Sequence, residues 1–325
     1  MKTEAIRIAR HGGPDVLELT QIEVGDPGPG EVRIRNHAIG VNYVDTYYRT
    51  GLYPLSMPHG LGVEGAGVVE ATGAGVKGLR EGDRVAYAQG PVGAYAGARV
   101  MPAATVVKLP KTVEFETAAA ILVKGLTVQY LFRQVYRLQG YETILFHAAA
   151  GGVGLIACQW ARALGVRLIG TVGSAAKAEL ARDNGAWATI DYSREDFVGR
   201  VLELTDSAKV PVVFDGVGKD TWEGSLDCLQ PLGLMVSFGN ASGPVTGVSL
   251  GILAQKGSLF VTRPTLATFV TPRERFEQMC AELFGMIESR QIVIGVDRRY
   301  PLADAAQAHR DLEARATTGS IVLTP

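Results

Sequence analysis

The sequence predicts an α/β protein in which a doubly wound parallel sheet is inserted between an N-terminal β-rich domain and its C-terminal return. Short apolar segments alternate with helical segments over residues 143–262, as they do in parallel sheets with helices on both faces. The first hundred or so residues instead contain short β-type segments separated by turns. A chain of 325 residues is also longer than a domain with a single hydrophobic core usually is. We predict two domains, residues 1–124 with 265–325 and residues 125–264.

The N-terminal part is predicted to be rich in strands. Clusters of glycine, proline and charged residues at 26–30 and 79–83 are typical of turns between strands. A helix follows at residues 116–136 and leads to the central domain. The predicted strands are residues 16–24, 31–38, 65–72, 84–88 and 98–101.

The central part is predicted to alternate strands and helices. Six strand candidates interleaved with helices indicate a parallel, doubly wound sheet. After it come a helix at 272–289 and a closing β-type segment at 319–323. The predicted central strands begin at residue 143 and continue at 167–172, 189–190, 210–215, 233–239 and 258–262. The helices between them are a segment after residue 154, then 175–184, 194–204 and 221–229.

A glycine-rich turn follows the first of these strands. The apolar run 143–146 is followed by small residues and glycines over 148–154, and then by an apolar helical stretch. Small residues let a backbone come close to a pyrophosphate, and a helix N-terminus offers free N–H groups and a partial positive charge. Ala149 stands where the first glycine of the G-x-G-x-x-G pattern would be, with Gly151 and Gly154 in the other two places. The turn therefore predicts a dinucleotide site.

Composition excludes several functional classes. The formal net charge of −1 leaves no excess of cations for binding a polyanion. The three cysteines, Cys158, Cys228 and Cys280, are too widely spaced for a disulfide framework or a zinc cluster. The sequence contains no run of about 20 apolar residues that would predict a membrane span, and its N-terminus shows no signal-peptide pattern. We expect a cytoplasmic protein.

Eight segments spread over nearly the whole chain match one known family. They are residues 11–14, 40–47, 49–54, 62–69, 124–127, 147–154, 238–243 and 262–264. On these residues the chain resembles the medium-chain dehydrogenase/reductases, and within them the NADPH-dependent quinone oxidoreductases of the zeta-crystallin-like branch. The resemblance implies a GroES-like β-rich domain, a Rossmann domain that binds NADPH, and a homodimer joined through the edge strand near residues 258–262.

Departures from the zinc alcohol dehydrogenases of the same superfamily concern the metal. Those enzymes place a histidine ligand directly before the glutamate that corresponds to Glu64, whereas Val63 stands here. They carry a cysteine ligand in the region of residues 38–46, which holds no cysteine in this chain. Zinc needs about four N, S or O donors. We expect no metal, and a structural role for Glu64 in a salt bridge or hydrogen bond.

The segment after the second central strand indicates the cofactor. NAD sites often place a carboxylate there to bind the ribose 2′-hydroxyl, but residues 171–177 contain none. Lys177 supplies a cation for a 2′-phosphate and Ser174 a short donor, and the resemblance adds Tyr192. The alternative for Lys177 is an exposed lysine at a helix start. The remaining cofactor residues implied by the resemblance are Tyr47, Thr127, Tyr130, Gly151, Gly152, Val153, Gly173, Val217, Phe238, Gly239, Asn240, Ser242, Arg263, Pro264 and Arg315.

The resemblance places the nicotinamide and substrate end at Asn42, Tyr47, Tyr53 and Thr127. Tyr47 and Tyr53 have an apolar body and a polar tip suited to a planar quinone, although each is also a plausible packing residue. His147 follows the first central strand and is interpreted as a hydrogen-bonded core histidine. No side chain is identified as a certain acid or base.

The activity implied by the resemblance is transfer of reducing equivalents from NADPH to a quinone. The cofactor carries the chemistry, while the protein supplies orientation and a dry cleft. An NADPH-dependent reductase of enals or enoyl thioesters has the same fold and stays an alternative. A non-enzymatic role in RNA binding or as a lens-type structural protein is more remote, because the chain lacks a basic tract.

Overall fold

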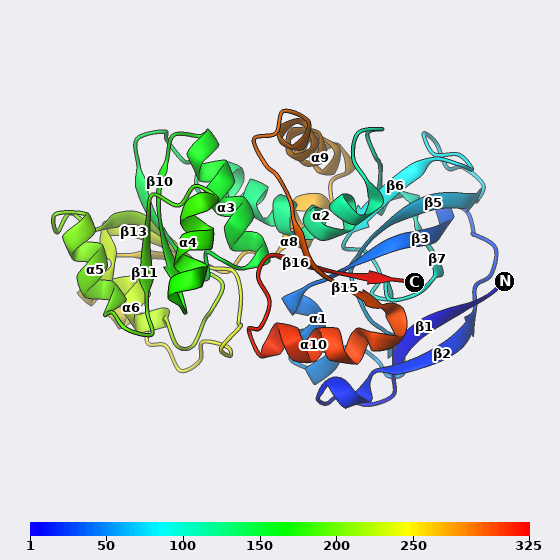
Figure 1. Ribbon diagram of the computed structural model, residues 1–325, viewed down its shortest axis with the longest axis horizontal. Coiled ribbons are helices and arrows are strands. Elements are labelled where there is room, and N and C mark those ends of the chain that lie inside the picture. The colour runs from blue at the N-terminus through cyan, green and yellow to red at the C-terminus, as the bar shows by residue number, and fades with distance from the viewer. The chain divides into compact units, whose positions relative to one another are not determined.

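The computed structural model describes residues 1–325, which form two compact units. The first unit comprises residues 1–126 and 269–325, and the second comprises residues 127–268. Figure 1 shows that the N- and C-terminal strands both belong to the first unit. No helix combines the length and apolar character needed to cross a membrane.

The second unit is built on a six-stranded parallel sheet in the order β11-β10-β9-β12-β13-β14. The order reverses between β9 and β12, which makes the carboxyl ends of these two strands the switch point where such sheets bind ligands. The predicted doubly wound sheet is confirmed with all six strands. They are β9 (Thr143–Phe146), β10 (Arg167–Val172), β11 (Ala188–Asp191), β12 (Val210–Asp215), β13 (Leu229–Ser237) and β14 (Phe260–Thr262).

Helices cover this sheet in two pairs. Helix α3 packs beside α4, and α5 packs beside α6 (Figure 1). Crossovers between parallel strands are right-handed. Because the strand order changes direction at β9, this rule places α3 and α4 on one face of the sheet and α5 and α6 on the other. A core of buried side chains from β9 to β13 lies under α5 and α6, including Leu145, Ile169 and Met235. The helices are α3 (Gly152–Ala163), α4 (Ala175–Asp183), α5 (Phe197–Leu204), α6 (Trp222–Asp227) and α7 (Gly251–Gln255).

The first unit contains two sheets. A seven-stranded sheet runs in the order β15-β16-β3-β5-β6-β8, with β7 also paired to β3, and a three-stranded sheet has the order β2-β1-β4. Strand β16 pairs with β3 in antiparallel register, so the C-terminal segment completes the N-terminal sheet. The strands are β1 (Lys2–Ile8), β2 (Glu18–Glu23), β3 (Glu31–Val41), β4 (His59–Gly60), β5 (Glu64–Thr72), β6 (Arg84–Ala88), β7 (Ala98–Pro102), β8 (Val106–Lys108), β15 (Val296–Pro301) and β16 (Ser320–Thr324).

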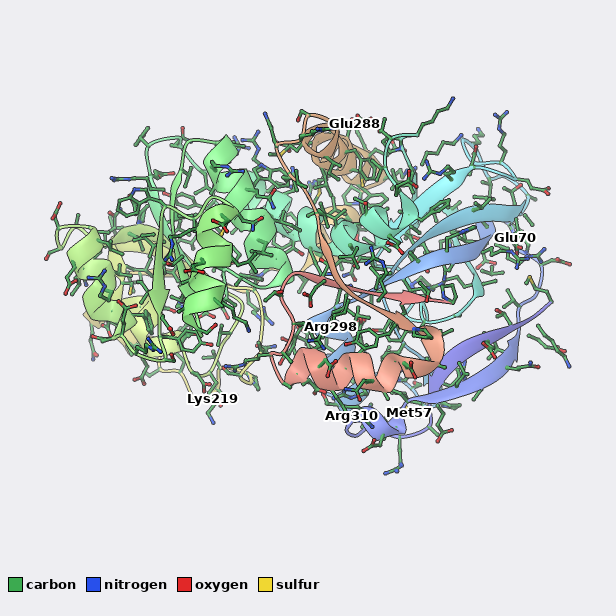
Figure 2. All side chains as sticks on the ribbon, viewed as in Figure 1. Met57, Glu70, Lys219, Glu288, Arg298 and Arg310 are labelled. Atoms are coloured by element: carbon green, nitrogen blue, oxygen red, sulfur yellow. The ribbon has the colours of Figure 1, made fainter.

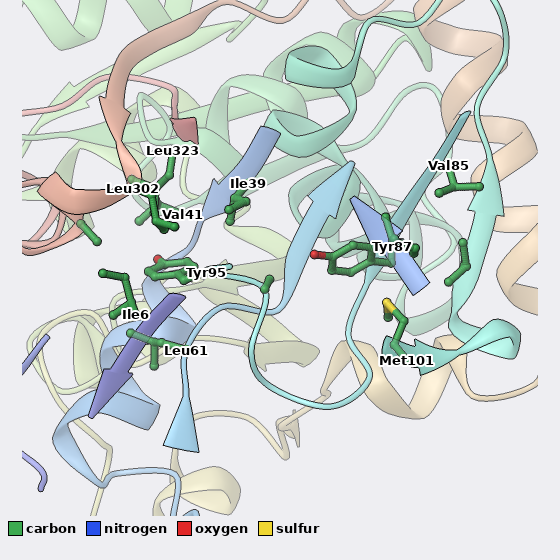
Figure 3. Packing of buried hydrophobic residues seen from close by; sticks show 14 of the residues in the cluster. Ile6, Ile39, Val41, Leu61, Val85, Tyr87, Tyr95, Met101, Leu302 and Leu323 are labelled. Carbon is green, nitrogen blue, oxygen red and sulfur yellow. The ribbon is translucent and has the colours of Figure 1, made fainter. Parts of the chain in front are cut away.

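The core of the first unit joins its two sheets to the C-terminal segment. Ile6 of β1, Ile39 of β3 and Leu323 of β16 pack around the buried ring of Tyr95 (Figure 3). At the surface of this unit, Arg298 of β15 is paired with Asp311 at 2.7 Å (Figure 2).

Helices α1 (Tyr43–Thr50), α9 (Arg273–Glu288) and α10 (Ala305–Glu313) belong to the first unit, and α2 (Phe115–Tyr130) and α8 (Leu266–Val270) bridge the points where the chain passes between units. The short turns are η1 (Pro14–Val16), η2 (Ala103–Thr105), η3 (Leu131–Val135) and η4 (Leu302–Asp304).

Several predicted elements need correction. The strand predicted at 16–24 begins only at Glu18, because Pro14 starts a tight helical turn that ends at Val16. The helix predicted at 116–136 is regular only to Tyr130 and continues through Leu131–Val135 as a wider π-type turn. The first-unit helices α1 and α10 were not predicted at all.

Candidate functional site

The glycine-rich turn connects β9 to α3 in a tight backbone arrangement. Ala148 adopts a left-handed conformation with φ of 57°, and helix α3 begins after Gly151. A Cβ on Gly154 would lie 2.4 Å from the Ala148 carbonyl oxygen, so only glycine fits there. The N–H groups of the first helical turn have no partners within the helix. The turn is thus a ready-made anion site at the switch point of the sheet.

The departure from the glycine pattern at Ala149 is compensated in the neighbouring strand. Ala149 is fully buried, and its Cβ lies 2.5 Å from the position that a Cβ on Gly170 of β10 would occupy. The methyl group of residue 149 therefore fills the space that a side chain at residue 170 would need.

His147 joins a buried polar network beneath the turn. Asp215 of β12 accepts hydrogen bonds from the Ser225 hydroxyl at 3.0 Å and from the backbone N–H of Val217 at 2.7 Å. Because Ser225 donates to Asp215, the Nε2–H of His147 must donate to Ser225 (2.9 Å), and Nδ1 accepts from the Thr171 hydroxyl (2.9 Å). Burial lowers the pKa of His147 against the opposing effect of Asp215. His147 is neutral and structural, which confirms the interpretation as a core histidine.

The end of β10 brings together four of the predicted cofactor residues, Gly173, Ser174, Lys177 and Tyr192. Ser174 begins α4, and its Oγ accepts a hydrogen bond from the Lys177 backbone N–H at 3.3 Å. The Ser174 hydroxyl hydrogen is then still available for a phosphate oxygen. The Tyr192 phenol oxygen lies 2.7 Å from the position of a Cβ on Gly173, so it covers this turn. Lys177 is half-buried.

Two loops after β12 and β13 are joined by hydrogen bonds. The Ser242 hydroxyl donates to the Val217 carbonyl at 2.9 Å and accepts from the Asp220 N–H at 3.0 Å. A Cβ on Gly239 would lie 2.3 Å from the Gly216 carbonyl oxygen, so the loops are in backbone contact. The Phe238 ring lies over Gly216. The two loops thus form one group of contacting residues beside the switch point, namely Val217, Phe238, Gly239 and Ser242.

Asn240 and Arg263 contact each other in the same region. With the amide oriented by its hydrogen bonds, the Asn240 side-chain oxygen accepts from Arg263 Nη2 at 2.9 Å, and its nitrogen donates to the Gly239 carbonyl at 3.0 Å. Arg263 Nη1 also donates to the Ser237 carbonyl at 2.8 Å. Pro264 follows directly after this arginine, beyond the end of β14.

In the first unit, helix α1 carries a group of tyrosines. Tyr47 is buried, and its ring centroid lies 5.2 Å from that of Tyr53 in an edge-to-face arrangement. Tyr43 and Tyr48 extend the group, with centroids 5.9 Å from Tyr47 and 5.7 Å from Tyr53 respectively. The predicted substrate residues Tyr47 and Tyr53 therefore do lie together, within a larger aromatic cluster.

Asn42 belongs to a buried polar cluster that also holds Glu64 and Lys124. The Asn42 amide nitrogen donates to Glu64 Oε2 at 2.7 Å, and Glu64 Oε1 accepts from the Val123 N–H at 2.6 Å. The Lys124 ammonium lies 3.6 Å from Glu64 Oε2. Burial raises the pKa of Glu64, while Lys124 and the hydrogen bonds oppose this. The structural role expected for Glu64 is confirmed. Lys124 was not predicted as a site residue, although it begins one of the matched segments.

A second buried network ties α1 to α10. The Arg49 guanidinium donates to His309 Nδ1 at 2.9 Å, so His309 Nε2–H must donate to the Tyr95 oxygen at 3.0 Å. Tyr95 in turn donates to Asp45 Oδ2 at 2.9 Å. Arg49 is held by Glu313 at 2.6 Å. Burial and Arg49 lower the pKa of His309 to about 3, which keeps the ring neutral.

The remaining predicted residues lie outside these groups. Thr127 and Tyr130 are buried in the last turn of α2. Arg315 lies in the first unit, at the turn after α10, with φ of 56°. Gly152 and Val153 are the first two residues of α3.

The residue that stands where the zinc dehydrogenases carry a histidine ligand does not suit the metal. Val63 offers an alkyl group, which is not a zinc ligand. The structure contains no group of three or more His, Cys, Asp or Glu side chains that could hold a metal ion.

Comparison with known proteins covers the whole chain. Residues 28–111 match the family model described as alcohol dehydrogenase GroES-like domain, and residues 152–285 match the one described as zinc-binding dehydrogenase. The chain is 62% identical to a quinone oxidoreductase of Pseudomonas aeruginosa, over 98% of this chain and 99% of that protein. It is 43% identical to a 2-haloacrylate reductase of Burkholderia, over 98% of each chain.

A solved structure agrees with these matches. The crystal structure of Escherichia coli quinone oxidoreductase complexed with NADPH superposes with a TM-score of 0.98 at 54% identity, covering 99% of this chain and 100% of that one. The predicted GroES-like and Rossmann domains are thereby confirmed as the fold class. The chain belongs to the quinone oxidoreductases of the medium-chain dehydrogenase/reductase superfamily.

Proposed function

We propose that this protein is an NADPH-dependent quinone reductase. The observation that carries the proposal is the likeness to quinone oxidoreductases over essentially the whole chain. The arrangement at the end of β10 supports NADPH, because it offers Ser174 and Lys177 and no carboxylate directly after the strand. We assign cofactor binding to residues 125–264 and substrate binding to residues 1–124 with 265–325.

The chain's residues fit the cofactor at two places. The α3 N-terminus, with Gly151, Gly152 and Val153, suits the pyrophosphate, because backbone N–H groups are exposed there and Gly154 allows close packing. Gly173, Ser174, Lys177 and Tyr192 suit the 2′-phosphate. We further assign to the cofactor the residues Tyr47, Thr127, Tyr130, Val217, Phe238, Gly239, Asn240, Ser242, Arg263, Pro264 and Arg315.

The bound dihydronicotinamide supplies a hydride, so the protein needs to orient the reactants and exclude water. We assign Asn42, Tyr47, Tyr53 and Thr127 to the substrate end. The edge-to-face pair Tyr47 and Tyr53 offers aromatic surface to a planar ring, and their phenol groups offer donors to its oxygens.

Reduction of an activated alkene is the second candidate. It is favoured by the 2-haloacrylate reductase among the relatives, which covers the same length of chain. In both reactions the substrate accepts hydride at an atom that is activated by a conjugated electron-withdrawing carbonyl. The two reactions therefore suit the same scaffold.

Steady-state kinetics test the proposal. NADPH oxidation is followed with 1,4-benzoquinone, 9,10-phenanthrenequinone, an enal and 2-chloroacrylate as acceptors. We expect the highest kcat/KM with a quinone. A tenfold preference for the enal or the haloacrylate would assign the protein to the alkene reductases instead.

We also propose a cytoplasmic homodimer joined through β14. This strand is the last of its sheet, and Phe260 and Val261 on its two faces are 60% and 40% exposed. An uncovered apolar edge strand is a natural place for pairing with a second copy. Three buried cysteines without disulfides support a reducing compartment.

A further inference from the structure

Lys124 is a buried lysine whose hydrogen-bonding capacity the protein does not use fully. Its side chain is 7% exposed. An ammonium group has three N–H donors. Its contacts are one long hydrogen bond to the Val41 carbonyl at 3.4 Å and the ion pair with Glu64 Oε2 at 3.6 Å. A buried cation with such loose partners is costly unless another group completes its coordination.

Glu64, the partner of Lys124, is fixed by the backbone around it. A Cβ on Gly40 would lie 2.3 Å from Glu64 Oε2 and 2.1 Å from the Ala119 carbonyl oxygen, so only glycine leaves room for the carboxylate. The other oxygen of Glu64 is held by the Val123 N–H. The position of the carboxylate is therefore fixed, and the carboxylate in turn orients its two polar neighbours, Asn42 and Lys124.

Asn42 is oriented by the same carboxylate. Its amide nitrogen donates to Glu64, so its amide oxygen must point away as an acceptor. That oxygen serves the capping box with Asp45 at the start of α1, and Asn42 is only 5% exposed. The cluster thus offers one N–H donor with a positive charge, on Lys124.

We propose that the Lys124 ammonium is a catalytic residue that donates a hydrogen bond to the substrate oxygen on which negative charge develops. This inference rests on the proposed quinone reductase activity, and on the assignment of Asn42 to the substrate end. Lys124 then supplies a positive charge beside the Glu64 carboxylate. Glu64 is a positioning residue for both neighbours.

The charge that develops in the reaction favours such a group. Hydride arrives from the dihydronicotinamide with both electrons of its C–H bond, which oxidises the cofactor and reduces the quinone. The product is a quinol mono-anion, which becomes the quinol when solvent supplies a proton. A preorganised cationic donor stabilises the developing anion in a site shielded from water. Lys124 donates a hydrogen bond in this step and transfers no proton.

The proposal is tested with Lys124→Met, which keeps the apolar stem and removes the charge. Wild-type turnover of quinones with NADPH is measured first, so that failure of the proposed function is seen separately. We expect the variant to bind NADPH with unchanged Kd and to lose about ten- to a hundredfold in kcat. The loss should be larger for tetramethyl-1,4-benzoquinone than for 1,4-benzoquinone, because the methyl groups make the anion more basic and more dependent on stabilisation.

Lys108→Met is the matched control, because it removes an ammonium from an exposed ion pair with Asp83 in the same unit. It should keep wild-type kcat. Lys124→Arg keeps the charge and should retain more activity than Lys124→Met. If Lys124→Met does not fold, Lys124→Gln, which keeps an N–H toward Glu64, is measured in the same way.

Equal losses for both quinones, or an unchanged kcat, would overturn the proposal. Failure of both neutral variants to fold would also overturn it, because Lys124 would then be a structural counter-ion of Glu64.

Discussion

At the scale of single residues, the size of one side chain decides how closely two backbone segments approach. Ala149 and Gly170 illustrate this, because the methyl group of one occupies the space that a side chain of the other would fill. The pair explains why the turn tolerates alanine at a position where glycine is usual. Substitutions at the two positions should therefore have coupled effects on the free energy of unfolding.

We expect Gly170→Ala to destabilise the protein by about 1–3 kcal/mol, because the added Cβ meets Ala149 in a packed core. Adding Ala149→Gly should recover most of this loss. Urea unfolding of the two single variants and the double variant gives the coupling energy. Additive effects within about 0.5 kcal/mol would show that the two positions are independent.

Lys177 determines the preference for NADPH over NADH in our account. A charge-assisted hydrogen bond to the 2′-phosphate is worth roughly 1.5–3 kcal/mol. Lys177→Ala should therefore raise KM for NADPH about ten- to a hundredfold and leave KM for NADH nearly unchanged. Ser174 and Tyr192 lie at the same turn and hold the effect toward the lower end.

The control for Lys177→Ala is Lys256→Ala, which removes a lysine paired with Asp227 elsewhere in the second unit. Equal losses for the two cofactors would mean that Lys177 acts through folding or through the adenine pocket.

At the scale of elements, the start of α1 is fixed by buried polar groups. The Asp45 carboxylate accepts from the Asn42 N–H at 2.8 Å and from Tyr95, while its other oxygen is buried without a partner. Burial raises the pKa of Asp45 to about 7. An asparagine at this position resembles the protonated acid in shape and does not ionise.

We expect Asp45→Asn to change the pH dependence of stability. Between pH about 4 and about 7, folded wild type holds a proton on Asp45 that the unfolded chain releases, so wild-type stability falls as pH rises through this range. The variant lacks this pH-dependent contribution. Its free energy of unfolding should therefore rise relative to that of wild type by up to roughly 4 kcal/mol over this range, with no further change in the difference above pH 7. Urea unfolding at pH 5, 6, 7 and 8 measures the gap. A gap that stays constant with pH would contradict the assignment.

Elements with a strong local pattern could be predicted from the sequence. Strands β6, β10 and β12 have the predicted bounds, because each is a short buried run between clear turns. Helix α5 starts three residues later than predicted, since the Asp196 carboxylate caps the N–H groups of Val198 and Gly199.

Helix α1 was missed because Tyr43–Thr50 is rich in tyrosine and threonine, which favour strands. Asn42 followed three residues later by Asp45 was the available signal for a helix start, in the manner of a capping box.

At the scale of the whole molecule, predictability depended on whether the site residues are close in the sequence. The glycine turn and the Ser174–Lys177 segment were found because each is continuous. The cluster of Asn42, Glu64 and Lys124 joins three elements separated by about 20 and 60 positions, so its geometry appears only in the folded chain.

The proposed dimer makes a further prediction at this scale. Phe260→Glu places a charge on the exposed edge strand β14, where a second copy would bury it. We expect a shift from dimer to monomer in analytical ultracentrifugation. Tyr141→Glu, at an exposed aromatic side chain just before β9 in the same unit, is the control and should leave the oligomeric state unchanged. A wild-type protein that sediments as a monomer would contradict the dimer directly.

The most direct test of the central claim is the specificity of the wild-type enzyme for both reactants. Initial rates are measured with NADPH and NADH, each with 1,4-benzoquinone, 9,10-phenanthrenequinone, an enal and 2-chloroacrylate. Our account predicts that the highest kcat/KM belongs to NADPH with a quinone, at least about tenfold above NADH with the same quinone. Equal use of the two cofactors, or a tenfold preference for an alkene acceptor, would contradict it.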